Sequence, residues 1–207
     1  MIWRSPWYPR FVFLACLVPL AVLAWQWRHH EFGVNSIEYV ERYLGRCTLR
    51  LLLLTLSITP LRRIPGLGGL IRVRRMLGLY TFFYGCIHGL YYFAADAQWD
   101  RQVIVDDLTH RRFFIYGMLA LLSMAPLAAT SFDRAIRWMG GKRWQWLHRL
   151  IYLSAIFAIV HYTLQNKGIV LTPLYYGALV LLLLLIRAVF FVRKKLRRPH
   201  PVRVYQT

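Results

Sequence analysis

Long apolar segments alternate with short polar connections along this chain of 207 residues. A helix that crosses a membrane needs about 20 mostly apolar residues, and six stretches have that character, with no internal repeat between them. The pattern predicts an all-α, polytopic membrane protein that is a single domain over 1–207. Its bundle of six transmembrane helices is expected at about 11–27, 45–60, 76–95, 113–130, 146–164 and 172–192.

Basic residues gather in alternate connections between the predicted spans. The first set of connections carries 17 Lys and Arg and one acid, whereas the second set carries seven basic and seven acidic residues. The first set consists of residues 1–10, 61–75, 131–145 and 193–207. The second set consists of residues 28–46, 96–112 and 165–172. Because Lys and Arg are retained on the cytoplasmic side, both termini are predicted to be cytoplasmic.

The composition narrows the class of protein. With 58% hydrophobic residues and a mean hydropathy of +0.41, the chain is too apolar for an ordinary soluble domain. A net charge of +19 could indicate nucleic acid, but membrane topology already explains the basic runs. The three cysteines are far apart and have no metal-binding spacing. No Rossmann-type GxGxxG is present, so another protein would have to bind any nicotinamide.

Three histidines lie inside predicted spans, His88 in 76–95 and both His148 and His161 in 146–164. A charged side chain at mid-membrane costs roughly 2.5–3.5 kcal/mol on the insertion scale, so an ionisable residue there usually serves a function. A neutral imidazole nitrogen is also a common axial ligand of haem iron. All three are therefore candidate haem ligands.

Depth separates these histidines. Counted from residues 76 and 145 at 1.5 Å per residue, His88 lies about 18 Å into the membrane, His161 about 24 Å and His148 about 5 Å. His88 and His161 are thus predicted to clamp one porphyrin in the outer half of the membrane. His148 and His161 differ by about 20 Å of rise, so they cannot bind the same iron. A second haem at His148 would lack an evident partner.

Two other uses of these histidines stay open. A membrane histidine can donate an interhelical hydrogen bond, and it can relay protons. Proton relays usually recruit Asp or Glu, and none of the eight acids falls within the predicted spans. The sequence therefore favours electron transfer over proton transport.

Three arginines also lie inside predicted spans: Arg50, Arg149 and Arg187. Arginine pairs with anionic groups such as haem propionates and flavin phosphates, so all three are candidate contacts of an anionic cofactor. Snorkelling to the interface is the alternative, and it has equal weight for Arg149 and Arg187. Arg50 is about one turn inside its predicted span, which favours a cofactor contact there.

Three segments resemble the MsrQ (YedZ) family, the haem-binding membrane subunits of a bacterial methionine sulfoxide reductase system in the ferric-reductase-like transmembrane superfamily. They are GRCTLRLLLLTLSITPL from Gly45, LIRVRRMLGL from Leu70 and WQWLHRLIYL from Trp144. The resemblance covers predicted spans two to six. It implies a multi-pass protein of the bacterial inner membrane, with His88, His161 and His148 as haem axial ligands.

The resemblance also implies cofactors and partners. It implies haem b, and FMN in some members, for which the basic cytoplasmic loop around Arg72, Arg74 and Arg75 is a candidate site. Electrons would come from the quinone pool or a cytosolic flavin reductase. They would pass to MsrP, a periplasmic molybdopterin subunit that reduces methionine sulfoxide in oxidised envelope proteins. The superfamily often has two histidines on the third span, where this chain has His88 alone, so one haem and two haems both stay open.

Two alternative functions compete with this interpretation. The first is a stand-alone transmembrane ferric or quinone reductase, which would use the same cofactor without a periplasmic partner. The second is a non-redox membrane scaffold or transporter, in which the histidines would serve packing alone. Absence of haem would favour the scaffold or transporter, whereas bound haem would fit either of the two redox hypotheses.

Overall fold

The computed structural model describes residues 5–166 and 171–196, and this part of the chain is helical and contains no strand. The helices are α1 Trp7–Arg28, α2 Ser36–Leu61, the 3-10 helix η2 Gly68–Val73, α3 Arg74–Tyr91, the π-helix η3 Tyr92–Asp96, α4 Arg101–His110, α5 Arg112–Ala129, α6 Asp133–Met139, α7 Gly141–Leu147, α8 Leu150–Gln165 and α9 Leu171–Leu196.

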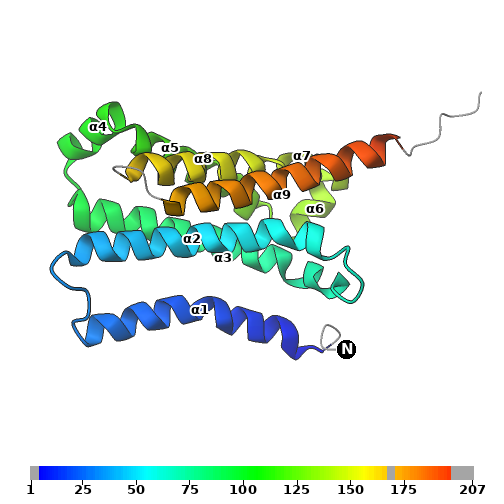
Figure 1. Cartoon of the computed structure of the whole chain (residues 1–207), viewed down its shortest axis with the longest axis horizontal. Helices are drawn as coiled ribbons and strands as arrows, with labels where there is room; N and C mark the ends of the chain where they lie inside the picture. Colours follow the sequence, from blue (N-terminus) through cyan, green and yellow to red (C-terminus); the bar gives the residue numbers. More distant parts are fainter. Residues whose placement is uncertain (1–4, 167–170, 197–207) are drawn as a thin grey trace, which may run out of the picture.

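The long helices run side by side along one axis (Figure 1). Helix α2 packs along α3, α5 packs along α8, and α9 lies against both α8 and α2. Helix α1 lies at the edge of the bundle, next to α3. Helix α4 marks one end of the bundle, called the α4 end, and α6 and α7 mark the other, called the α6 end (Figure 1). Helix α1 begins and α9 ends at the α6 end.

Five helical segments of the described chain are long and apolar enough to cross a membrane. They are Trp7–Arg28, Ser36–Leu61, Arg112–Ala129, Gly141–Gln165 and Leu171–Arg193. The predicted third span corresponds to α3 and η3, which are helical but less apolar. The sixth span therefore stays a prediction.

Helix α2 begins at Ser36, nine residues before the predicted start of the second span. The reason is a strong N-terminal cap, in which the Asn35 side chain accepts a hydrogen bond from the backbone N–H of Glu38 at 3.2 Å. The Glu38 carboxylate in turn accepts from the Asn35 amide at 2.9 Å, and it lies in the favourable first turn. Residues 36–44, which were expected in a connection, are thus helical, and Val40 and Leu44 among them are buried in the bundle.

Apolar clusters and small polar contacts hold the helices in register. One buried cluster joins α1, α2 and α3, and a second joins α2, α8 and α9. The hydroxyl groups of Ser123 on α5 and Ser154 on α8 are 2.7 Å apart. The Thr55 hydroxyl on α2 is 3.5 Å from that of Thr81 on α3. Small residues and interhelical hydroxyl contacts are typical of helices that pack closely within a membrane.

Candidate functional site

Two of the three span histidines face each other between α3 and α8. The ring centroids of His88 and His161 are 6.1 Å apart, and the ring planes make an angle of 72°. His88 is three residues from the end of α3, and His161 is four residues from the end of α8. At 1.5 Å per residue both rings lie about 5 Å from the helix ends on the α4 side. Both helices run toward the α4 end, so the pair lies at one depth.

Hydrogen bonding orients the His161 ring. Its Nδ1 atom is 2.7 Å from the backbone carbonyl oxygen of Phe113. A carbonyl oxygen can only accept, so Nδ1 carries the proton and donates, and Nε2 keeps a free lone pair. This is the arrangement that metal-ligating histidines commonly have, with the second ring nitrogen bonded to a carbonyl.

The His88 ring has a different environment. Its Nδ1 atom is buried and makes no hydrogen bond of good geometry, although the backbone of Glu41 lies within interaction range. The ring packs against Gly45 of α2, where an added Cβ would be 3.4 Å from His88 Cε1. The side chain is nevertheless not fully enclosed, because part of its surface lines a cavity.

Gly117 on α5 provides the closest approach to the pair. A Cβ added at this position would be 2.8 Å from Nδ1 of His161, which is closer than real Cβ contacts occur. The hydrogen bond to Phe113 holds the His161 ring against this glycine. A residue without a side chain is therefore required beside His161.

The cavity between the two histidines is enclosed by α2, α3, α5 and α8. Its wall is mostly apolar and aromatic, and its charged and amide side chains lie toward the α4 end, which is called the mouth of the cavity. The apolar wall includes Leu49, Leu52, Phe93, Phe113, Phe114, Met118, Leu121 and Met124. The polar mouth includes Glu41, Arg42, Arg46, Gln165 and Asn166. Such a cavity suits a large apolar ligand with an anionic edge.

The cavity mouth corrects one expectation. The acids were expected outside the spans, but Glu38 and Glu41 belong to α2, one of the five span-length helices. Glu41 lines the cavity, and its Oε1 atom is buried without a hydrogen-bond partner. The prediction failed because the cap at Asn35 extends the helix beyond its apolar part.

His148 lies apart from the other two histidines. It follows α7, and its Nε2 atom is 3.1 Å from the Thr130 hydroxyl. The Trp144 ring stacks on it at a centroid distance of 3.8 Å, and the Trp144 indole N–H donates to the Thr130 carbonyl at 2.9 Å. The Nε2 atom of His148 is therefore within hydrogen-bond distance of the Thr130 hydroxyl. No second histidine of the described chain faces His148.

The three arginines predicted to contact a cofactor do not line the cavity. Arg50 donates to the Tyr176 hydroxyl at 3.0 Å. Arg149 is exposed near the Phe191 ring, at 5.8 Å from its centroid. Arg187 reaches from α9 toward α2 and donates to the Leu56 carbonyl at 2.6 Å.

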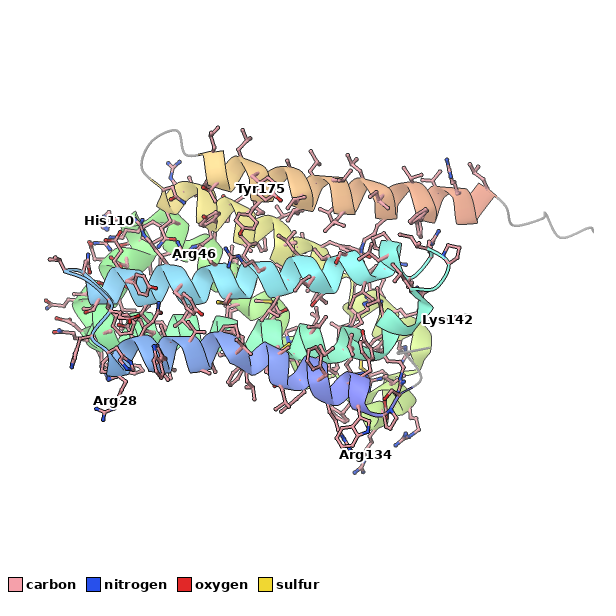
Figure 2. All side chains as sticks on the ribbon, turned by 60° about the horizontal axis from the view of Figure 1, so that its bottom comes forward. Arg28, Arg46, His110, Arg134, Lys142 and Tyr175 are labelled. Atoms are coloured by element: carbon pink, nitrogen blue, oxygen red, sulfur yellow. The ribbon has the colours of Figure 1, made fainter. Side chains whose placement is uncertain are left out.

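Arg42 and Arg46 take the position that was expected for Arg50. They follow Glu41 on the first turns of α2 and lie at the cavity mouth. Figure 2 shows Arg46 toward the end that carries Arg28 and His110. The sequence signal was available, because 42, 46 and 49 share one helical face. It was missed because residues 28–46 were assigned to a connection.

The basic segment proposed for FMN lies at the α6 end. Arg72 lies in the last turn of η2, and Arg74 and Arg75 begin α3. The Arg75 guanidinium donates to the Asp133 carboxylate at 2.6 Å, and this hydrogen bond holds the pKa of Asp133 below its ordinary value. Arg74 is half-buried and lies within electrostatic range of Arg187, Arg62 and His148.

Comparison with known proteins defines the class. Residues 44–159, which include His88 and most of the cavity helices and end two residues before His161, match the family described as "Ferric reductase like transmembrane component". With five span-length helices, the chain is a multi-pass membrane protein of the ferric-reductase-like class.

Curated relatives give the particular family. The chain is 46% identical over 157 residues to the "Protein-methionine-sulfoxide reductase heme-binding subunit MsrQ" of Ralstonia nicotianae, covering 76% of this chain and 72% of the relative. It is 43% identical over 193 residues to the protein of that name from Azospira oryzae, covering 93% and 82%. The chain belongs to the MsrQ family.

Proposed function

We propose that the chain is a membrane electron-transfer subunit that holds a b-type haem between His88 and His161. The observation that carries this proposal is the pair of facing imidazoles in one apolar cavity, with ring centroids 6.1 Å apart. The curated relatives carry the name "heme-binding subunit", which supports the same assignment.

The geometry of the pair fits two axial ligands of one iron. With metal–nitrogen bonds of about 2 Å and ring nitrogens about 1 Å from their ring centres, two opposed imidazoles have centroids roughly 6 Å apart. The observed 6.1 Å agrees with that separation. The rings need not be parallel, because each plane can turn about its own metal–nitrogen bond. Because the proton of His161 is on Nδ1, its Nε2 atom keeps a lone pair that is available to a metal.

The rest of the cavity fits the other parts of a haem. The aromatic and aliphatic wall suits a macrocycle, and the glycines at positions 45 and 117 keep space beside the two rings. Arg42 and Arg46 at the mouth suit the anionic propionates, since guanidinium groups pair with carboxylates. The proposal therefore moves the propionate contacts from Arg50, Arg149 and Arg187 to these two residues.

When bound, haem supplies a one-electron carrier. His88 and His161 would hold it, and the apolar wall of the cavity would exclude water from it and lower the local dielectric. The hydrogen bond from His161 to Phe113 holds the ring at a fixed angle and raises its basicity as a ligand. His148 has no part in this haem, because its Nε2 faces Thr130 at a different place in the fold.

The proposed direction of electron transfer is from the α6 end to the α4 end. The basic connections lie at the α6 end, which the positive-inside rule assigns to the cytoplasm of the bacterial inner membrane. We propose that α3 is the sixth span and that both termini are cytoplasmic. The quinone pool or a cytosolic flavin reductase would supply electrons, with FMN near Arg72, Arg74 and Arg75. The periplasmic molybdopterin subunit MsrP would accept them, and it would perform the sulfoxide chemistry.

Reoxidation kinetics test this function. The purified protein is reduced, and its spectrum is followed after addition of methionine sulfoxide with and without the periplasmic reductase. Reoxidation that requires both additions supports the proposal. Reoxidation by ferric chelate or quinone alone would indicate a stand-alone reductase. A protein that takes up no haem when haem is supplied would indicate a scaffold or transporter, and either result contradicts the proposal.

A further inference from the structure

Helix α5 holds the His161 ring through two residues that are four positions apart. The Phe113 carbonyl oxygen accepts from Nδ1 at 2.7 Å, and Gly117 lies against the ring. In an α-helix the carbonyl of residue i points toward residue i+4, and the two residues share one face. A glycine at i+4 therefore uncovers the second lone pair of that carbonyl for a donor on a neighbouring helix.

The same spacing recurs beside His88. Gly45 follows Glu41 by four positions on α2. A Cβ added at Gly45 would be 3.4 Å from Cε1, 3.7 Å from Nε2 and 3.8 Å from Nδ1 of His88. The backbone of Glu41 is within interaction range of the same ring. Each facing histidine therefore lies against a glycine that has a helical carbonyl one turn before it.

These two arrangements occupy equivalent places in the fold. Helices α2 and α5 both begin at the α4 end, and they pack along α3 and α8, which carry the histidines (Figure 1). Glu41 lies in the second turn of α2, and Phe113 lies in the first turn of α5. His88 and His161 lie near the ends of α3 and α8. The cavity is thus bordered by two helix pairs that present a histidine in the same way.

The two arrangements differ in how tightly they engage the ring. An added Cβ would be 2.8 Å from the nearest His161 atom at Gly117, but 3.4 Å from the nearest His88 atom at Gly45. His161 already donates to its carbonyl, whereas Nδ1 of His88 is buried without a hydrogen bond of good geometry. A buried polar atom without a partner is costly. His88 therefore has both the space and the energetic reason to turn toward the Glu41 carbonyl.

We propose that Gly45 and the main-chain carbonyl of Glu41 position His88, as Gly117 and the Phe113 carbonyl position His161. This inference rests on the proposed function, because it concerns a histidine that would ligate haem iron. When Nδ1–H of His88 donates to the Glu41 carbonyl, Nε2 keeps the lone pair for the metal. The second nitrogen of both ligands is then bonded to a carbonyl, which orients each ring and raises its basicity.

The Glu41 carboxylate is the competing acceptor for His88. Its Oε1 atom is also buried without a partner, and the residue lines the same cavity. The spacing favours the carbonyl instead, because a glycine at i+4 is needed to reach a main-chain oxygen but not to reach a side chain. The matching contact of His161 uses a carbonyl as well, since Phe113 has no polar side-chain atom.

Two supports of this kind determine how the bound rings are rotated. A ligating ring can turn only about its bond to the metal, and the hydrogen bond to a carbonyl fixes that rotation. The ring planes of His88 and His161 make an angle of 72°. We therefore expect a low-spin ferric electron paramagnetic resonance (EPR) signal with the strong anisotropy of steeply crossed imidazole planes.

EPR spectra of the purified full-length protein test the assignment. Gly45→Ala is the main variant. Gly78→Ala is the matched control, because Gly78 lies at the same α2–α3 contact, where its Cβ would meet Thr55 Cγ2 at 3.7 Å, but does not line the cavity. Glu41→Gln removes the carboxylate and keeps the main-chain carbonyl. Haem content, midpoint potential and thermal unfolding are recorded for each protein.

Gly45→Ala should shift the largest g value and make the midpoint potential more positive, because a less basic His88 stabilises the ferric state less. It should unfold at the wild-type temperature or above, since Ala favours a helix more than Gly does. Gly78→Ala and Glu41→Gln should keep the wild-type EPR signal.

Three results would overturn the inference. They are an unchanged EPR signal in Gly45→Ala, the same change in Gly78→Ala, and a changed signal in Glu41→Gln, which would assign the hydrogen bond to the carboxylate. A wild-type protein without haem would overturn the proposed function and this inference together. Failure of the inference alone is therefore recognised by normal haem content in the wild type.

Discussion

Single residues determine how the two facing histidines are held. Gly117 leaves space for the His161 ring, and the Phe113 carbonyl fixes the ring's rotation and its protonated nitrogen. Neither feature belongs to a recognisable motif, because one depends on a missing side chain and the other on a backbone atom. Both act on the same ring from α5, so the position of this helix controls the site.

Gly117→Ala tests this control. The added Cβ would lie 2.8 Å from His161 Nδ1, so the ring must move or its hydrogen bond to Phe113 must break. We expect haem retention to fall about tenfold, the usual effect of disturbing the orientation of a metal ligand. Haem per protein after purification measures it. Gly78→Ala is the control, because Gly78 does not line the cavity and its Cβ would meet only Thr55 Cγ2 at 3.7 Å; equal haem loss in both variants would contradict this account.

At the scale of elements, helix α4 is attached beside the cavity by a buried carboxylate. Asp107 is 1% exposed. It accepts from the Tyr92 hydroxyl at 2.5 Å and from Arg111 Nε at 2.9 Å. Tyr92 also lines the cavity. This contact therefore joins the connection between α3 and α5 to the wall of the site.

Asp107→Ala should destabilise the protein by about 2 kcal/mol or more, since it leaves a buried hydroxyl and a guanidinium without their acceptor. The thermal unfolding midpoint should fall, and haem retention should fall with it because Tyr92 is released. The neighbouring Asp106→Ala is the control. Asp106 is exposed and pairs only with His110, which is worth at most about 1 kcal/mol. Similar unfolding midpoints for the two variants would contradict an anchoring role.

The sequence predicted the long elements better than the connections. Apolar length located the cores of the spans, because burial in lipid demands about 20 apolar residues whatever the neighbours are. Depth comparison correctly brought His88 toward His161. The early start of α2 depends on a polar cap, and α4 and α6 are short helices with few apolar residues, so hydropathy did not reveal them. Arg42 and Arg46, which line the cavity, were placed in a connection for that reason.

At the scale of the whole molecule, the charge asymmetry and the fold agree in orientation. The first helix starts and the last described helix ends at the α6 end, where the basic connections also lie. The histidine pair lies near the opposite end, beside the α4 end. With the proposed orientation, an electron would leave from the periplasmic side.

Reporter fusions test this orientation and the role of α3 as the sixth span. A fluorescent protein fused to the C-terminus should fluoresce, since it folds in the cytoplasm. Alkaline phosphatase inserted after residue 99, between η3 and α4, should be active, since that connection is predicted to be periplasmic. If α3 did not cross the membrane, the reporter after residue 99 would be on the cytoplasmic side and inactive.

The haem-to-protein ratio of single histidine variants tests the central claim most directly. A pyridine haemochromogen assay is applied to purified His88→Ala, His161→Ala and His148→Ala proteins, with the exposed His110→Ala protein as the control. The account predicts that His88→Ala and His161→Ala each lose the haem held by the facing pair, whereas His148→Ala and His110→Ala keep it. Full haem retention in both His88→Ala and His161→Ala would contradict it.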